Sequence, residues 1–106
     1  RRPFLGVRYI LLNPMLKKRF RLPVEQGAFV LREGVPGRPA IMDGSAAQRA
    51  GIREGDIILA LNHTRIDEKI GIEDILEKTP LGSEVPVEIL RDGQEHTLTV
   101  TAEERV

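Results

Sequence analysis

The chain of 106 residues has no cysteine and only two histidines. Without cysteine it forms no disulfide bond and offers no thiolate to a metal ion, and the composition leaves the redox compartment open. Two imidazole groups are too few to suggest a metal centre. We therefore expect neither a metal site nor a cofactor.

Long apolar runs are also missing. No run of the sequence approaches the roughly 20 apolar residues that cross a bilayer, and no charged-then-apolar stretch resembles a secretion signal. We expect any targeting information to lie outside residues 1–106, and we do not expect membrane contact. The length suits one domain with its own hydrophobic core.

Charge is balanced in number but not in position. The chain has 16 basic and 16 acidic residues, yet every charged residue before Glu25 is basic. Such a block can attract a carboxylate ligand, an anionic membrane surface or an acidic neighbouring domain; the simpler interpretation is a solvated helix face. Nucleic-acid binding is not expected, because the domain is neutral overall and has few aromatic side chains to stack on bases. The basic residues are Arg1, Arg2, Arg8, Lys17, Lys18, Arg19 and Arg21.

Residues 44–62 form the most informative stretch. Ser45 is suited to cap a short alanine-rich helix, and Gly51 is suited to end it. Gly55 and Asp56 then break the chain before an apolar run at residues 57–61, which has the length of a buried strand. The pattern predicts a capped helix that leads into a buried strand, with a turn at Asn62.

The rest of the chain alternates short strands and helices. Strands are predicted at residues 5–11 and 27–32, and helices at residues 14–20 and 72–79. Asp92-Gly93 is a preferred two-residue turn, which places Ile89 opposite His96 in a C-terminal hairpin. The sequence therefore predicts an α+β fold, a partly open β-barrel or sandwich of five or six strands with two or three helices.

The order of these segments resembles that of PDZ domains. Phe4-Leu5-Gly6-Val7 has the apolar-apolar-glycine-apolar pattern of their carboxylate-binding loop, and it precedes a helix, a second strand, the segment at 44–62, an amphipathic helix and the terminal hairpin. The resemblance is closest to the permuted, bacterial-type PDZ domain of the HtrA (Deg) family of serine proteases. It covers nearly the whole chain, and the chain departs from the family at residues 33–43, which are longer than usual.

The resemblance implies a site for the C-terminus of a peptide. A turn that points successive amides into one hollow donates hydrogen bonds to a carboxylate, and the strand that follows offers its free edge to an extended ligand. A branched or aromatic last ligand residue is expected, and a hydroxyl two residues before it is not favoured. The implied carboxylate-binding residues are Leu5, Gly6, Val7 and Arg2, and the implied groove residues are Phe4, Arg8, Tyr9, Ile10, Ile72, Leu76 and Thr79.

The function that the resemblance implies is recruitment of peptide or unfolded-protein C-termini to an attached serine protease, with regulation of that protease, outside the cytoplasm. Two alternatives stay open. In the first, another part of the same protein fills the groove, and the domain serves to tether or assemble that protein. In the second, the domain belongs to a C-terminal processing or intramembrane protease. The chain itself is not expected to be an enzyme. It has nothing like the Gly-Asn-Ser-Gly-Gly segment of the protease domain, and Ser45 is better explained as a helix cap than as a partner of His63 and Asp67.

Overall fold

The computed structural model describes residues 3–32 and 39–104, and its main element is an open antiparallel sheet. Its strands lie in the order β2, β3, β4, β6, β7, with β5 paired to β4, and β1 pairs with β8 in a separate two-stranded sheet. The predicted α+β fold is confirmed, and the sheet does not close into a barrel. The strands are β1 (Pro3–Phe4), β2 (Tyr9–Leu11), β3 (Ala28–Val30), β4 (Ile57–Leu61), β5 (Thr64–Arg65), β6 (Glu84–Arg91), β7 (Gln94–Thr101) and β8 (Glu103–Glu104).

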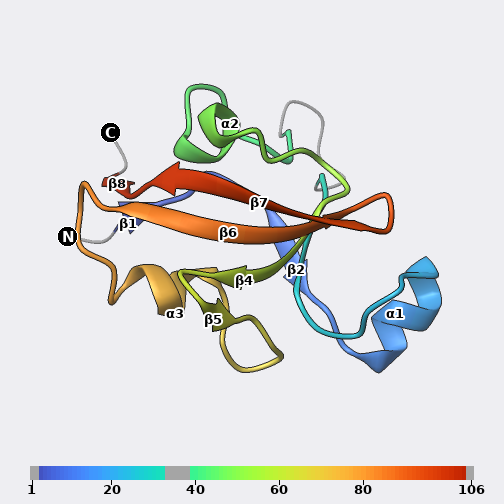
Figure 1. Ribbon diagram of the computed structural model, residues 1–106. Helices are drawn as coiled ribbons and strands as arrows, with labels where there is room; N and C mark the ends of the chain where they lie inside the picture. The colour runs from blue at the N-terminus through green and yellow to red at the C-terminus, as the bar shows by residue number, and fades with distance from the viewer. Residues whose placement is uncertain (1–2, 33–38, 105–106) are drawn as a thin grey trace.

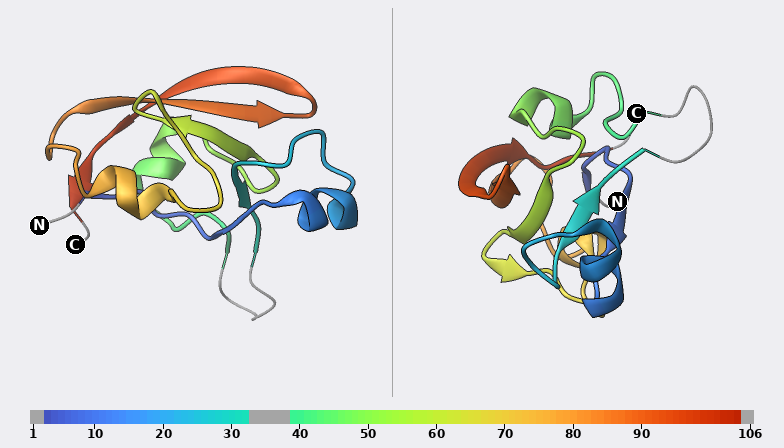
Figure 2. Two further views of the ribbon diagram at one scale, coloured as in Figure 1. Left: turned by 90° about the horizontal axis from the view of Figure 1, so that it is seen from below. Right: turned by 90° about the vertical axis from the view of Figure 1, so that its right-hand side faces the viewer.

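Three helices accompany the sheet, at different places around it. In Figure 1, α2 (Ala46–Ala50) lies on one side of the long β6–β7 hairpin and α3 (Ile72–Leu76) on the other, while α1 (Pro14–Phe20) lies at the far end of the molecule from α3. Figure 2 shows α3 beside the N-terminal segment, which it contacts at β1. None of the helices in the described residues is long and apolar enough to cross a membrane.

The C-terminal hairpin has the predicted register. Arg91 pairs with Gln94, and Ile89 pairs with His96. Asp92 and Gly93 both have positive φ, 51° and 77°, which is the geometry that this type of two-residue turn requires. The count of strands differs from the prediction, because β1, β5 and β8 are pairs of residues too short to leave a pattern in the sequence.

The apolar run of β4 is buried on both faces of the sheet. Ile58 and Leu61 join the main core, whereas Ile57 and Leu59 pack in a smaller cluster with Leu12. That smaller cluster also contacts α1 through Leu16, and the ring of Phe20 packs edge-on against Phe29 with centroids 5.5 Å apart. Because both faces are covered, the strand is continuously apolar rather than alternating.

Helices α1 and α2 both begin with a side-chain cap, and α2 ends at Gly51 as predicted, whereas α1 ends at Arg21 in the left-handed conformation. The side chain of Asn13 accepts a hydrogen bond from the amide of Leu16 at 2.8 Å, and Ser45 accepts one from Gln48 at 3.2 Å. Gly51 follows α2 with φ of 93°, a conformation that glycine adopts without a steric penalty. The last turn of α1 carries the basic side chains Lys17, Lys18 and Arg19, whose positive charge interacts favourably with the negative end of the helix dipole.

A buried ion pair ties the loop after α2 to the sheet. Asp56, only 1% exposed, accepts two hydrogen bonds from Arg91 of β6, at 2.8 and 2.7 Å, and a third from the amide of Arg53 at 2.8 Å. The guanidinium of Arg91 also donates to the carbonyl of Gly51 at 2.8 Å. The hydrogen bonds to the Asp56 carboxylate raise the pKa of Arg91 still further, so this guanidinium stays charged.

We predict that Asp56→Ala lowers the free energy of unfolding by about 3 kcal/mol, because it leaves Arg91 without its buried partner. Glu54→Ala is the matched control. Glu54 also faces an arginine, Arg32, but at 3.5 Å and with both side chains more than half exposed, so its loss should cost less than about 1 kcal/mol. Urea unfolding measures both, and equal losses would contradict the role given to the buried pair.

Candidate functional site

Strand β2 forms the free edge of the main sheet, since it pairs only with β3. The carbonyl of Arg8 accepts from the amide of Leu31, and the amide of Leu12 donates to the carbonyl of Gly27. In an antiparallel ladder, alternate residues direct their polar groups to opposite sides. The amides and carbonyls of Tyr9 and Leu11, which lie between these residues, therefore point away from β3, toward the open edge.

The loop before β2 presents unused amides beside that edge. Within residues 3–32 and 39–104, no backbone hydrogen bond has the amide of Leu5, Gly6 or Val7 as its donor. The carbonyls of the same loop are held, because Gly6 accepts from the amide of Met42 and Leu5 accepts from the amide of Ala47, each at 2.9 Å. The loop is thus fixed through its acceptors while three successive donors remain available to a ligand.

Gly6 allows this loop to lie directly against the start of α2. A Cβ atom added at Gly6 would lie 2.3 Å from the Cβ atom of Ser45, and the φ of Gly6 is 90°. Any side chain at this position would both strain the backbone and collide with the helix cap. The requirement for glycine in the loop therefore comes from residues 44–62, the scaffold segment, as well as from the loop itself.

A narrow hollow of about 50 Å³ lies between this loop and α3. Its walls come from the two elements that the sequence predicted, the strand edge and the helix, and Leu5 and Leu76 are 3% and 4% exposed. A water molecule needs roughly 10–15 Å³ of such space, so the hollow holds a few waters but not yet a peptide residue. Its lining residues are Pro3, Phe4, Leu5, Gly6, Val7, Tyr9, Ile72, Glu73 and Leu76.

A hydrogen bond between Tyr9 and Glu73 spans the space between β2 and α3. The Tyr9 hydroxyl donates to the Glu73 carboxylate, and it lies so near Gly71 that an added Cβ there would be 3.2 Å from it. Burial of the ring, together with this carboxylate, raises the pKa of Tyr9 well above its usual value. The bond joins β2 to α3 and closes the groove at the end that lies away from the loop.

The remaining predicted site residues lie at the margins or elsewhere. Arg2 is outside the described residues. Arg8 and Ile10 border a shallower hollow of about 660 Å³ along β2, shared with Tyr9 and Glu73, and Arg8 donates to the carbonyl of Pro39 at 2.6 Å. Ligand contact by any of these residues stays a prediction.

Thr79 does not line the groove, contrary to the prediction. Helix α3 ends at Leu76 rather than at residue 79. The chain then tightens, with the amide of Lys78 donating to Ile75 and that of Thr79 to Leu76. The Thr79 hydroxyl is buried and donates to the carbonyl of Ile75 at 2.9 Å, so this side chain completes the end of the helix instead.

Two residues in or beside the groove were not predicted there: Glu73 lines the hollow, and Ser45 lies against the loop at Gly6. Glu73 is an exposed residue next to Ile72 in the helix, and such a residue ordinarily faces solvent. Its bond to Tyr9 joins residues 64 positions apart in the chain. Only the placement of α3 against β2 reveals the Tyr9–Glu73 bond. The close approach of Gly6 to Ser45 had one signal in the sequence, which is the glycine itself.

Ser45, His63 and Asp67 have separate local roles. Ser45 caps α2, and His63 has φ of 65° in the turn between β4 and β5. The carboxylate of Asp67 accepts from the amides of Lys69 and Ile70, each at 2.8 Å, and these bonds hold the pKa of Asp67 below its usual range. The side chains of Ser45 and Asp67 are thus accounted for by the helix and the turn that contain them.

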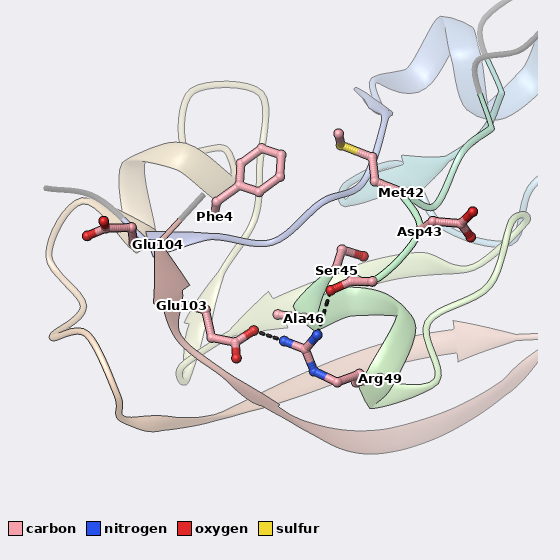
Figure 3. Close-up of a pocket in the computed structure, with 9 residues that line it drawn as sticks. Phe4, Met42, Asp43, Ser45, Ala46, Arg49, Glu103 and Glu104 are labelled. Atoms are coloured by element: carbon pink, nitrogen blue, oxygen red, sulfur yellow. Dashed lines mark hydrogen bonds and ion pairs between the residues drawn. The ribbon is translucent and has the colours of Figure 1, made fainter. Parts of the chain in front are cut away.

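A separate hollow of about 390 Å³ lies behind the loop, at the start of α2 (Figure 3). Arg49 enters it but already pairs with Glu103 and donates to the carbonyl of Gly44. The other charged side chains around it, Asp43 and Glu104, are acidic. Negative charge of this kind repels a carboxylate, so this hollow is a poorer site for a peptide C-terminus than the groove beside α3.

Residues 3–102 match the PDZ domain family. The chain therefore belongs to that family. The resemblance to the HtrA type within it is also confirmed, because the similar proteins are proteases of this type. A probable periplasmic serine protease of Haemophilus influenzae is 36% identical over 91% of this chain and 19% of its own length. The periplasmic serine endoprotease DegP of Escherichia coli is 31% identical over 86% of this chain and 18% of its own length.

Solved structures show the same fold. The HtrA-type protease AlgW, solved with a decapeptide, superposes with a TM-score of 0.77 at 24% identity, covering 99% of this chain and 30% of that chain. The HtrA3 PDZ domain, bound to the phage-derived ligand FGRWV, superposes with a TM-score of 0.74 at 23% identity, covering 95% of this chain and 86% of that chain. The chain spans about a fifth of the length of the curated relatives it matches, for example 19% of the Haemophilus protein.

We predict that Gly6→Ala costs about 3 kcal/mol of stability, because it combines backbone strain with a collision at Ser45. Gly51→Ala is the control. Gly51 has a similar φ of 93° but no atom within 4 Å of an added Cβ, so only the strain of about 1–2 kcal/mol remains. Chemical denaturation compares the two variants; a loss at Gly6 no larger than that at Gly51 would show that the contact with Ser45 is unimportant.

We also predict that Tyr9 ionises above the ordinary tyrosine value of about 10. The folded state then retains its phenolic proton longer than the unfolded state, so stability is lost as the pH rises above about 10. Because Tyr9 is the only tyrosine and the chain has no tryptophan, ultraviolet titration observes it directly. Glu73→Gln should lower the Tyr9 pKa, and Glu77→Gln on the same helix should not. Identical titrations of all three proteins would disprove the Tyr9–Glu73 bond in solution.

Proposed function

We propose that this domain binds the C-terminus of a peptide or unfolded protein by adding it as a strand to the edge of β2. The observation that carries the proposal is the set of unused amides of Leu5, Gly6 and Val7 at the end of an open strand edge. A carboxylate there accepts charge-assisted hydrogen bonds, which are among the stronger ones. The ligand's backbone then pairs with Tyr9 and Leu11.

The last ligand side chain enters the hollow between Leu5, Val7 and Leu76. Because these walls are apolar, a branched or aromatic residue gains most by entering. The hollow is small, about 50 Å³, so α3 and β2 must move apart to admit it. Together with the ordering of four or five ligand residues, this opening keeps the affinity modest, at roughly 1–100 μM or about −8 to −5.5 kcal/mol.

We further propose that the domain recruits such substrates to an attached serine protease and regulates it, outside the cytoplasm. The support is that relatives of the Deg type are named periplasmic serine proteases and are several times longer than this chain. In such an arrangement the domain supplies substrate selection, and the peptide bond is cleaved elsewhere in the protein. In this proposal, binding of a substrate C-terminus near β1 and α3 regulates the attached protease.

The test compares FGRWV as a free acid with the same peptide amidated at its C-terminus, both acetylated at the N-terminus, by isothermal titration calorimetry. The free acid should bind in the micromolar range and the amide at least about tenfold more weakly, because the amide loses the charge-assisted bonds at the loop. Equal affinity for the two peptides would rule out carboxylate capture.

A further inference from the structure

The geometry of the groove points to Glu73 as the residue that selects the third-from-last side chain of the ligand, and we infer that it selects a cationic one, lysine or arginine. This inference rests on the proposed strand addition and adds a substrate class to it. The ligand's cation takes the position on the carboxylate that the Tyr9 hydroxyl occupies in the closed groove.

Strand register brings that ligand residue to Glu73. A carboxylate held by the amides of Leu5, Gly6 and Val7 places the last ligand residue beside Val7. Two residues earlier, the ligand lies opposite Tyr9, because every second residue of β2 directs its polar groups to the open edge. Directly opposed residues of antiparallel strands extend their side chains to the same face, so this ligand side chain points where the Tyr9 ring points, toward Glu73.

The chemistry at that point favours a cation over a neutral donor. Glu73 is exposed and belongs both to the narrow hollow and to the longer hollow along β2. The neighbouring carboxylate of Asp74 is engaged, since it accepts from the amide of Gly71 at 2.9 Å. Within residues 3–32 and 39–104, the partner of Glu73 is the neutral phenol of Tyr9. A cationic ligand gives this carboxylate a stronger, charge-assisted partner.

Two arginines border the same long hollow, and both have other partners. Arg8 donates to the carbonyl of Pro39, and Arg32 pairs with Glu54 at 3.5 Å. These contacts hold the Arg8 guanidinium at Pro39 and the Arg32 guanidinium at Glu54, neither of which belongs to α3. Glu73 is therefore the charged group on the α3 side of the hollow.

The experiment measures the affinity of three free-acid peptides, FGRWV, FGAWV and FGEWV. We expect the arginine peptide to bind about threefold more tightly than the alanine peptide and about tenfold more tightly than the glutamate peptide, as for an exposed charge pair. Glu73→Lys should reverse the order of the arginine and glutamate peptides. Glu73→Gln, a milder change, should bring the arginine and alanine peptides to equal affinity.

Glu95→Lys is the control for net charge. Glu95 is exposed in β7, near the tip of the hairpin that lies at the opposite end of the molecule from α3 (Figure 1). This variant should keep the wild-type order of the three peptides. Tyr9→Phe should keep this order as well, because the preference depends on the Glu73 carboxylate. Loss of the bond that closes the groove should strengthen the binding of all three peptides.

The outcomes separate this inference from the function beneath it. If wild type binds the free acids but not the amides and shows no preference among the three peptides, the selection by Glu73 is wrong and the carboxylate site stands. The same conclusion follows if Glu73→Lys keeps the wild-type order. If no free acid binds, both the selection and the proposed function are overturned.

Discussion

The close approach of Gly6 to Ser45 is the constraint on which the site depends. With no side chain at Gly6, the loop lies against the cap of α2, and its carbonyls accept from Met42 and Ala47. These bonds fix the loop through its acceptors, and among the described residues the amides of Leu5, Gly6 and Val7 donate no backbone hydrogen bond. The helix at residues 46–50 thus sets the direction of the loop, although it does not line the groove.

The groove is held closed by a contact of a different kind. The bond from Tyr9 to Glu73 crosses from β2 to α3, and the space beneath it is about 50 Å³. Opening it costs one hydrogen bond and exposes apolar walls, so a ligand must repay both. A carboxylate at the loop and a cation at Glu73 would do so at the two ends of the same bound segment.

The elements governed by neighbouring residues could be predicted from the sequence. Asp92 and Gly93 specify a turn through their own φ angles, and that turn sets the register of the β6–β7 hairpin. Ser45 begins α2 as expected, and Asn13 begins α1 in the same way, because a cap bonds only three residues ahead. The apolar wall was predictable too, since Leu5, Val7 and Tyr9 alternate in the sequence from the loop into β2.

The features that depend on packing between distant elements were not predicted. Thr79 continues the helical spacing, but the chain tightens after Leu76 and turns its hydroxyl back to Ile75. Glu73 has the pattern of a solvent-facing residue, and only the position of α3 beside β2 gives it Tyr9 as a partner. The short strands β1 and β8 form because the two ends of the described chain meet, a meeting that no local signal encodes.

The central claim is that the loop amides capture a carboxylate. Nuclear magnetic resonance of the nitrogen-labelled domain tests it most directly, through the amide signals of Leu5, Gly6 and Val7 during titration with a free-acid peptide that ends in valine. The account predicts that these three signals move downfield, as amides that gain a charged acceptor do, together with signals along β2 and α3. Shifts confined to α1, at residues 14–20, with the loop signals unmoved, would contradict it.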